Sequence, residues 1–467
     1  MKFIKYFTLM LFLGVLVTSC EDSLDINTDP LAATSADANV VLPYVLAAYT
    51  ARHTTELGTR IMDVPQHFSA CFNSPRGGNT SSFLTGNTWG MMYNDVLGNL
   101  LLVEQDAIAA GPSSNNVAAI AKILKANTFF ELSSLWEEVP FSQALNAVEF
   151  SSPEFDAQVD IFNGSVAMID DAIELIDAIP AEGTVDLSGG DLIYKGDMAL
   201  WRRYANSLKL RILMMLRNKV DVSSQIASTL SQPLLESNDQ SAIIRYEDAA
   251  GASNGYNQLV EAFFGISNEV QGVYAPSPTL FNLLDGDPRF GMIISDTDAE
   301  PCIMGQFAFN LGCPAISDNV IRNSLPHMLM MPAEVSLYKA ELAMDAGDMA
   351  TASTEYKNGV SLNVAWWGGD IPGAQLSIPG ADASAFVDGL AAPTLESIHE
   401  QLYIESFIRP VVAWNSVRRT GTPALAAVPG SNITTILKRF NYPPDEIGAN
   451  PNTPQNLPTD APMWFEK

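Results

Sequence analysis

Residues 191–211 read DLIYKGDMALWRRYANSLKLR, and the fold can be worked out from this stretch in both directions. From Met198 to Asn218 the apolar side chains recur mainly at spacings of three and four residues, the period of one helix face. Those on that face are Trp201, Tyr204, Ala205, Leu208, Ile212 and Met215. Four polar side chains lie off it: Arg202, Arg203, Asn206 and Lys209. The stretch therefore predicts a helix with one buried face, entered from a loop over 183–196.

Helical periodicity continues on both sides of this helix. It begins near Leu42, and further helices are predicted over residues 89–109, 117–136, 156–179, 258–264, 332–344, 349–363 and 393–417. Residues 241–246 could form one short strand. Paired helices of about 34 residues resemble the tetratricopeptide unit, and 332–344 with 349–363 makes such a pair. The pattern predicts a mainly α fold of tetratricopeptide-like helix pairs with little β structure.

Long irregular segments interrupt the helices. They cover residues 65–86, 265–330 and 366–393, and the tail from Thr420 is rich in proline. Such loops in a compact protein are usually functional, so we expect functional residues among them.

The charge of the chain limits its partners. The 467 residues carry 25 Lys and Arg against 53 Asp and Glu, a formal net charge of -28. Nucleic-acid binding depends on cations that neutralise phosphates, and docking on anionic lipid heads needs basic clusters. The composition therefore argues against both and favours a neutral or cationic ligand.

The N-terminus has the features of an export signal. Lys2 and Lys5 precede an apolar run from Phe7 to Val17, which is too short for a membrane-spanning helix. Cys20 follows small residues, as in the bacterial lipobox, where the cysteine is lipidated. We expect a signal peptide over 1–19, a lipidated N-terminus and tether over 20–40, and a single α-helical domain over 41–467. The alternative is an ordinary signal peptide with an incidental cysteine.

Cys302 and Cys313 enclose a short loop that contains a glycine. An oxidising exterior would allow a disulfide between them. No metal site is predicted, because the cysteines have no neighbouring histidine. No cofactor motif occurs either, although acidic positions around Asp285 and Asp287 could hold a structural calcium ion without EF-hand spacing.

One motif suggests an enzyme. Gly251-Ala252-Ser253-Asn254-Gly255 matches Gly-x-Ser-x-Gly, the nucleophile elbow of serine hydrolases. The chain lacks the alternating strands and helices of that fold, so a hydrolase using Ser253 is only an alternative. No pair of carboxylates is marked for glycoside hydrolysis, and we expect no enzymatic activity.

Several motifs together resemble the SusD/RagB family, in particular its SusD-like outer-membrane nutrient-binding lipoproteins of Bacteroidetes. They run in order along the chain: Asp25-Ile26-Asn27-Thr28-Asp29-Pro30, Trp136-Glu137-Glu138-Val139-Pro140-Phe141, the block at 191–211, Asp287-Pro288-Arg289, Ala413-Trp414-Asn415-Ser416-Val417-Arg418-Arg419-Thr420-Gly421 and Arg439-Phe440-Asn441-Tyr442-Pro443. The chain departs from the family where Glu137-Glu138 replace the usual Gly-Asp, which leaves the geometry of that turn open. Glu21-Asp22 resembles the acidic export signal of lipoproteins on the cell surface.

The resemblance implies a surface-exposed, lipid-anchored lid over a SusC-like TonB-dependent transporter. The lid would capture a glycan, either an oligosaccharide or a polysaccharide, and deliver it to the barrel. A peptide receptor of the same family is the alternative.

The resemblance also places the ligand site on two segments, the early loop (residues 72–89) and the irregular middle of the chain (residues 256–274). Side chains there that offer ring faces or planar hydrogen-bonding groups are Phe72, Arg76, Asn79, Phe83, Asn87, Trp89, Tyr256 and Tyr274. Trp89 could equally belong to the core. Trp366 and Trp367 could stack on a sugar ring, but packing at the end of the helix pair is the favoured reading.

Overall fold

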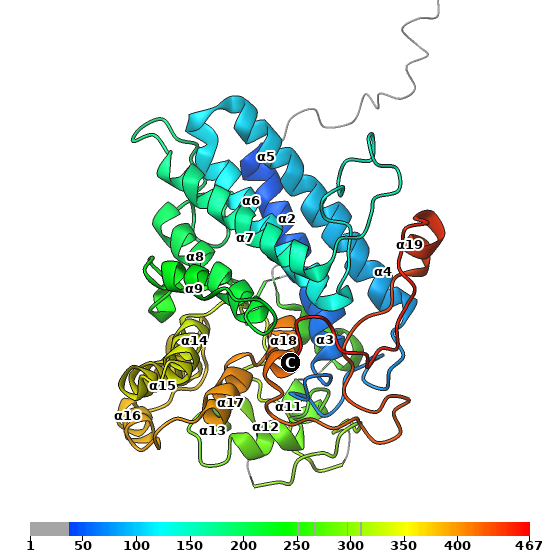
Figure 1. Cartoon of the computed structure of the whole chain (residues 1–467). Helices are drawn as coiled ribbons and strands as arrows, with labels where there is room; N and C mark the ends of the chain where they lie inside the picture. The colour runs from blue at the N-terminus through cyan, green and yellow to red at the C-terminus, as the bar shows by residue number, and fades with distance from the viewer. Residues whose placement is uncertain (1–36, 250–252, 266, 297, 309–310) are drawn as a thin grey trace, which may run out of the picture. The chain divides into compact units, whose positions relative to one another are not determined.

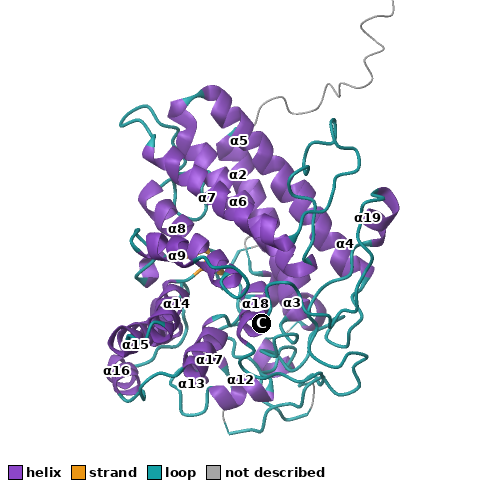
Figure 2. Cartoon of the chain, in the orientation of Figure 1, coloured by secondary structure: helices purple, strands orange, loops and turns teal. Residues whose placement is uncertain are grey.

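The computed structural model describes residues 37–249, 253–265, 267–296, 298–308 and 311–467. Within them the chain is mainly helical, with long loops and two short strands (Figures 1 and 2). The expected signal peptide and nearly all of the expected tether lie outside the described residues. Helix α2 (Ala38–Arg52) begins slightly before the expected domain start at residue 41, because Asp37 accepts a hydrogen bond from the Asn39 amide.

The helix predicted from Met198 is α8 (Met198–Leu216), and Trp201 and Tyr204 are fully buried on its apolar face. Asp197 accepts hydrogen bonds from the first amides of the helix, as an N-cap does. Asp191 fixes the preceding turn, because its Oδ2 accepts from Trp201 Nε1 at 2.6 Å and from the Gly196 amide at 2.8 Å. One buried carboxylate therefore holds the loop against the helix.

The other elements follow in chain order. The first half contains α3 (Thr59–Ile61), α4 (Ser82–Gly90), α5 (Gly98–Ala110), α6 (Asn115–Trp136), α7 (Gln158–Asp177), α9 (Ser223–Leu230) and β1 (Ala242–Ile244). The second half contains α10 (Gly255–Phe264), α11 (Asn268–Gln271), α12 (Pro278–Leu283), α13 (Phe290–Ile293), β2 (His327–Met330), α14 (Pro332–Asp345), α15 (Met349–Ala365), α16 (Gly380–Asp388), α17 (Leu395–Glu405), α18 (Pro410–Thr420) and α19 (Pro444–Ala449). Three π-helical segments, η1 (His53–Gly58), η2 (Met91–Leu97) and η5 (Trp366–Asp370), continue α2, α4 and α15, and short 3₁₀ turns form η3 (Pro112–Ser114) and η4 (Asn238–Gln240).

Neighbouring helices pack in pairs, as the sequence predicts. Helix α6 packs against both α5 and α7, α7 packs against α8, and α14 packs along α15 (Figure 1). Almost every residue of α6 is buried, which explains why its sequence is apolar nearly all round.

The predicted helix over 393–417 is wrong in one respect, because the structure has two helices there. Helix α17 ends at Glu405 and α18 starts at Pro410. Proline has no amide hydrogen and disfavours helical geometry in the preceding residue. The break includes Ile408 at φ 67°, in the left-handed region.

The predicted loops contain more structure than the periodicity indicated. Strand β2 and helices α11 to α13 lie within the irregular stretch 265–330, and η5 and α16 lie within 366–393. Strands β1 and β2 pair antiparallel. These elements are short, so none has enough repeats to show a clear period.

Two buried carboxylates join the helices. Glu334 on α14 accepts from Arg211 Nε at 2.7 Å and from Arg409 Nη1 at 2.8 Å, so it links α8, α14 and the start of α18. Burial raises the pKa of Glu334, but the two arginines outweigh burial and hold this pKa well below its usual range. Glu131 on α6 accepts from the Tyr49 hydroxyl at 2.8 Å, and burial raises its pKa to about 7.

Candidate functional site

A cavity of about 330 Å³ opens where the early loop meets α10. It is lined by Thr59, Arg60, Phe72, Asn73, Leu259, Phe263 and Phe264, and we call it the aromatic cleft. Three phenylalanines with a guanidinium and an amide make a mostly apolar site with a few polar groups, which is the usual composition of a small-ligand site.

Helix α10 supplies one wall of the aromatic cleft. Asn254 caps its start by accepting from the Tyr256 amide at 2.9 Å, and Gly265 ends it at φ 69°, a left-handed conformation that suits glycine. Leu259 and Phe263 are four residues apart and so share one helix face. Phe263 is 77% exposed, so its ring is open to a ligand.

Arg60 on α3 supplies the opposite wall. Its Nε lies 3.2 Å from Glu56 Oε2, and its guanidinium lies 5.3 Å from the ring centre of Phe83, which is 59% exposed. The Asn87 amide donates to Glu56 Oε1 at 3.0 Å. Two of the predicted residues, Phe83 and Asn87, are therefore brought to this wall. Both lie on helix α4, whose start Ser81 caps by accepting from the Leu84 amide, so Phe83 is helical and not part of the loop predicted over 65–86.

Arg76 was predicted to bind ligand hydroxyls, but in the structure it braces the early loop. Its Nη1 donates to Asp63 at 2.6 Å and to the Cys71 carbonyl at 3.2 Å, and its Nη2 donates to the Gly305 carbonyl at 3.4 Å. Asp63 also accepts from the Cys71 amide and from the Ser74 hydroxyl. Burial raises the pKa of Asp63, and the Arg76 guanidinium opposes this shift.

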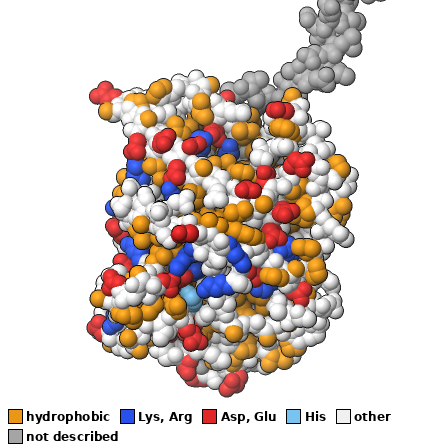
Figure 3. Space-filling view, in the orientation of Figure 1, with side chains coloured by type: hydrophobic (Ala, Val, Ile, Leu, Met, Phe, Trp, Pro, Cys, Tyr) orange, Lys and Arg blue, Asp and Glu red, His pale blue; other side chains and the backbone are white. Residues whose placement is uncertain are grey.

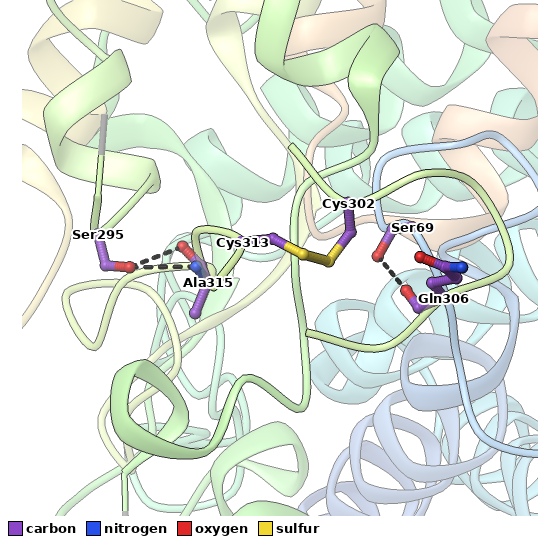
Figure 4. Close-up of a disulfide and its surroundings, with 6 residues drawn as sticks. All are labelled: Ser69, Ser295, Cys302, Gln306, Cys313 and Ala315. Atoms are coloured by element: carbon purple, nitrogen blue, oxygen red, sulfur yellow. Dashed lines mark hydrogen bonds between the residues drawn. A yellow bond between two sulfur atoms is a disulfide. The ribbon is translucent and has the colours of Figure 1, made fainter. Parts of the chain in front are cut away.

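A disulfide between Cys302 and Cys313 closes a loop beside the cleft (Figure 4). Within this loop the Gln306 carbonyl accepts from the Ser69 hydroxyl, and the Gly305 amide donates to the Ser69 carbonyl, both at 2.8 Å. Phe307 stacks on Phe72 with ring centres 4.7 Å apart. The disulfide loop therefore packs on Phe72, a lining residue of the aromatic cleft.

Five predicted ligand-binding aromatics belong to the hydrophobic core instead. Trp89 packs edge-on against Trp136 at 5.1 Å, and Tyr256 packs edge-on against Tyr274 at 5.6 Å. Trp366 and Trp367 are 2% and 1% exposed. Buried rings offer no face to a sugar. The burial agrees with the favoured reading of Trp366 and Trp367, packing at the end of the α14–α15 pair, and with the core alternative for Trp89, whereas Tyr256 and Tyr274 were expected in the ligand site and are core residues.

The remaining predicted positions lie apart from the cleft or outside the description. Asn79 is exposed on the early loop and is not among the lining residues. Cys20 lies outside the described residues. Both carboxylate oxygens of Asp287 accept hydrogen bonds from Arg289. The carboxylate suggested as a calcium ligand is therefore already paired with a guanidinium. In the described ranges no group of three or more potential ligand side chains gathers to hold a metal ion.

The Ser253 hydroxyl pairs with an amide and not with a base. Gln258 Nε2 donates to Ser253 Oγ at 2.8 Å. An amide cannot take up the proton of a nucleophilic hydroxyl, so this contact does not activate Ser253. Gly251 and Ala252 of the motif lie outside the described residues.

A second cleft of about 650 Å³ lies along α10, lined by different residues of the helix. Asn257 and Glu261 of α10 face it, together with Asp318, Arg322 and Asn323. Its lining is mainly polar, whereas that of the aromatic cleft is mainly apolar. Residues of α10 therefore line both clefts.

Surface charge agrees with the composition. Acidic side chains are spread over the face in Figure 3, while lysines and arginines gather mainly in a band across its middle. Many described basic side chains are paired with acids, for example Arg217 with Asp345 and Lys209 with Asp170. Among the described residues, no helix is long and apolar enough to cross a membrane.

The sequence prediction missed six of the residues that line the aromatic cleft: Thr59, Arg60, Asn73, Leu259, Phe263 and Phe264. One signal was available for two of them. Phe263-Phe264 ends an amphipathic helix and is followed by Gly265, and adjacent side chains of a helix point about 100° apart, so one of the two rings lies off the single buried stripe of such a helix.

These features define a class of protein: a mainly helical protein in which clefts lined by loop and helix residues lie beside tetratricopeptide-like helix pairs. Residues 39–443 match the SusD-like family model, described as starch-binding associating with outer membrane. The chain therefore belongs to the SusD-like family, whose members are generally non-catalytic nutrient-binding proteins.

Solved structures show the same fold. A chitin-binding protein has a TM-score of 0.79 at 22% identity, covering 92% of this chain and 100% of that one. A SusD-like protein described as Bacteroidetes AC2a has 0.77 at 18% identity, covering 92% and 100%. A SusD/RagB family protein of Bacteroides thetaiotaomicron VPI-5482 has 0.77 at 17% identity, covering 92% and 99%. No curated protein sequence matches the chain.

Proposed function

We propose that this chain is a lipoprotein exposed at the outer-membrane surface that captures a glycan in the aromatic cleft and delivers it to a SusC-like TonB-dependent transporter. The observation that carries the proposal is the exposed ring of Phe263 beside Phe72, Phe264 and Arg60. Aromatic faces pack against the apolar C–H face of a sugar ring, and a few polar groups then fix its orientation. Chitin-type oligosaccharides are the first candidates, since one structural relative is a chitin-binding protein.

Calorimetry on the full chain tests the ligand and the cleft together. The chain is titrated with oligosaccharides of chitin, cellulose and starch and with a mixed peptide pool. Saturable binding of a glycan is expected, and Phe263→Ala should weaken it by about tenfold or more, since about 1.4 kcal/mol of lost stacking gives tenfold. Ile108→Ala removes another exposed apolar side chain, on α5 and away from the cleft lining, and should leave affinity unchanged.

The outcomes separate the alternatives. Equal affinity of wild type and Phe263→Ala would contradict the aromatic cleft as the site. Binding of peptides alone would replace the glycan by a peptide ligand. New saccharide products after the titration, lost in Ser253→Ala, would favour the hydrolase.

The anchor and the partner need tests in cells. Cys20→Ala should release the protein from the membrane fraction, and retention would contradict the lipid anchor. Wild-type protein purified from outer membranes should bring a TonB-dependent barrel with it in a stable ratio. Purification without such a barrel would contradict delivery to a transporter.

A further inference from the structure

A third cavity, of about 530 Å³, opens at the end of the α14–α15 pair and shares no lining residue with the two clefts on α10. Its lining includes Asn238, Arg245, Asn358, Ser361, Trp366 and Asp370, and we call it the Trp366 cleft. Its volume lies within the range of about 300–1,000 Å³ that small-ligand sites occupy.

Two buried polar atoms of the lining have no hydrogen-bond partner among the described residues. They are Nε1 of Trp366, a donor, and Oδ1 of Asn238, an acceptor. Buried polar atoms in folded proteins are nearly always satisfied by protein, water or ligand. Trp366 and Asn238 line the same cavity, so one molecule bound there would supply a complement to both.

The contacts of Asn238 fix which of its amide atoms is the acceptor. Its Nδ2 donates to the Leu362 carbonyl at 2.9 Å and to Asp370 Oδ2 at 2.8 Å. A flipped amide would place its oxygen against these two oxygens, which cannot donate. Oδ1 is therefore held as an acceptor.

The backbone also places Trp366 unusually. It starts the π-helical segment η5, which continues α15 with one wider turn before the chain leaves the helix at Ile371. Such π segments inside helices frequently occur at functional sites. The neighbouring Trp367 packs on Phe407 and does not line the cavity.

The charges around the cleft are of both signs and favour a neutral ligand. Arg245 has no ion-pair partner within the described part of the chain, and Asp239 and Asp370 bring carboxylates to the same lining. An anionic ligand would be repelled by the two carboxylates, and a cationic ligand would be repelled by the guanidinium. Hydroxyl groups both donate and accept, so a neutral polyol can use the guanidinium, the carboxylates, the indole N–H and the amide oxygen.

We propose that the Trp366 cleft is a second ligand site that binds a neutral mono- or disaccharide, with Trp366 Nε1 as donor and Asn238 Oδ1 as acceptor. The sugar class rests on the proposed function, whereas the location of the site rests on its own cavity. The ring of Trp366 is buried, so this site recognises its ligand by hydrogen bonds and not by stacking.

The test is titration of the full chain with N,N′-diacetylchitobiose, cellobiose and maltose, followed by calorimetry and ligand-observed NMR. Ser361→Trp fills the cleft from an exposed position on α15, and Trp366→Phe removes the indole donor. Trp367→Phe is the matched control, since it removes a buried, unpartnered indole N–H that lies outside the cleft. Phe263→Ala reports on the aromatic cleft separately.

At least one of the three sugars is expected to fill two sites per chain. Ser361→Trp and Trp366→Phe should each weaken one site by tenfold or more, and Trp367→Phe should weaken neither. Should Trp366→Phe fail to fold, the surface change Ser361→Trp decides alone. Two sites of unchanged affinity in Ser361→Trp, or no binding outside the site sensitive to Phe263→Ala, would overturn the inference. Binding lost in Ser361→Trp and kept in Phe263→Ala supports it and contradicts the aromatic cleft as the main site.

Discussion

Removing the disulfide between Cys302 and Cys313 should lower both the stability of the chain and its ligand affinity. The bond closes a loop with a sequence separation of 11 residues. For a loop of that length the chain-entropy relation gives about 9 cal/mol/K, or about 2.8 kcal/mol at room temperature. We therefore expect Cys302→Ser with Cys313→Ser to lower the free energy of unfolding by about 3 kcal/mol.

The affinity effect follows from the contacts of the disulfide loop. Gly305 and Gln306 are hydrogen-bonded to Ser69, and Phe307 stacks on Phe72 of the aromatic cleft. A loop that moves more freely supports Phe72 less well, so ligand affinity should fall several-fold.

Urea unfolding followed by far-UV circular dichroism measures the first effect, and calorimetric titration measures the second. Reductant provides the control: it should shift wild type to the values of the double variant and leave that variant unchanged. A loss of stability below about 1 kcal/mol would refute the loop-entropy reasoning. Unchanged affinity in a destabilised variant would refute the support of Phe72 by the loop.

Three further changes test the packing. Glu131→Gln removes a carboxyl group whose pKa burial raises to about 7. The folded state favours the protonated carboxyl, so the unfolding free energy of the wild type should fall relative to that of the variant by roughly 3 kcal/mol between about pH 4 and pH 8. Parallel pH profiles of the two proteins would contradict this. Glu334→Ala leaves Arg211 and Arg409 buried without their shared partner and should cost about 4 kcal/mol in urea unfolding, whereas a loss under about 1 kcal/mol would show that water replaces the carboxylate. Glu137 has φ 77°, so Glu137→Gly should be more stable than Glu137→Ala by about 1 kcal/mol in thermal unfolding, and equal stability would show that the turn is unstrained.

The long helices were predictable because their apolar residues repeat over several turns. The stretch 191–211 gave its helix start, its loop and its buried Trp201 correctly. The role of Asp191 was not predictable, because a single carboxylate that accepts hydrogen bonds from a turn amide and from an indole leaves no periodic signal in the sequence. Pro410 marks the break between α17 and α18, but the apolar residues that continue on both sides of it favour one long helix.

The candidate site was predictable by region and much less by residue. Phe72, Phe83 and Asn87 do lie at or beside the aromatic cleft. Tyr256 and Tyr274 have the same kind of ring and sequence neighbourhood, yet they are buried. Which aromatic ring of a loop faces solvent depends on contacts between segments distant in sequence, such as Phe72 with Phe307, and no local pattern encodes those contacts.

The most direct test of the central claim is a crystal structure of the full chain with a bound chitin oligosaccharide. We expect a sugar ring stacked on Phe263, with its hydroxyl groups hydrogen-bonded to Arg60 or Asn73. Density for the oligosaccharide elsewhere, with an empty aromatic cleft at saturating ligand, would contradict the claim.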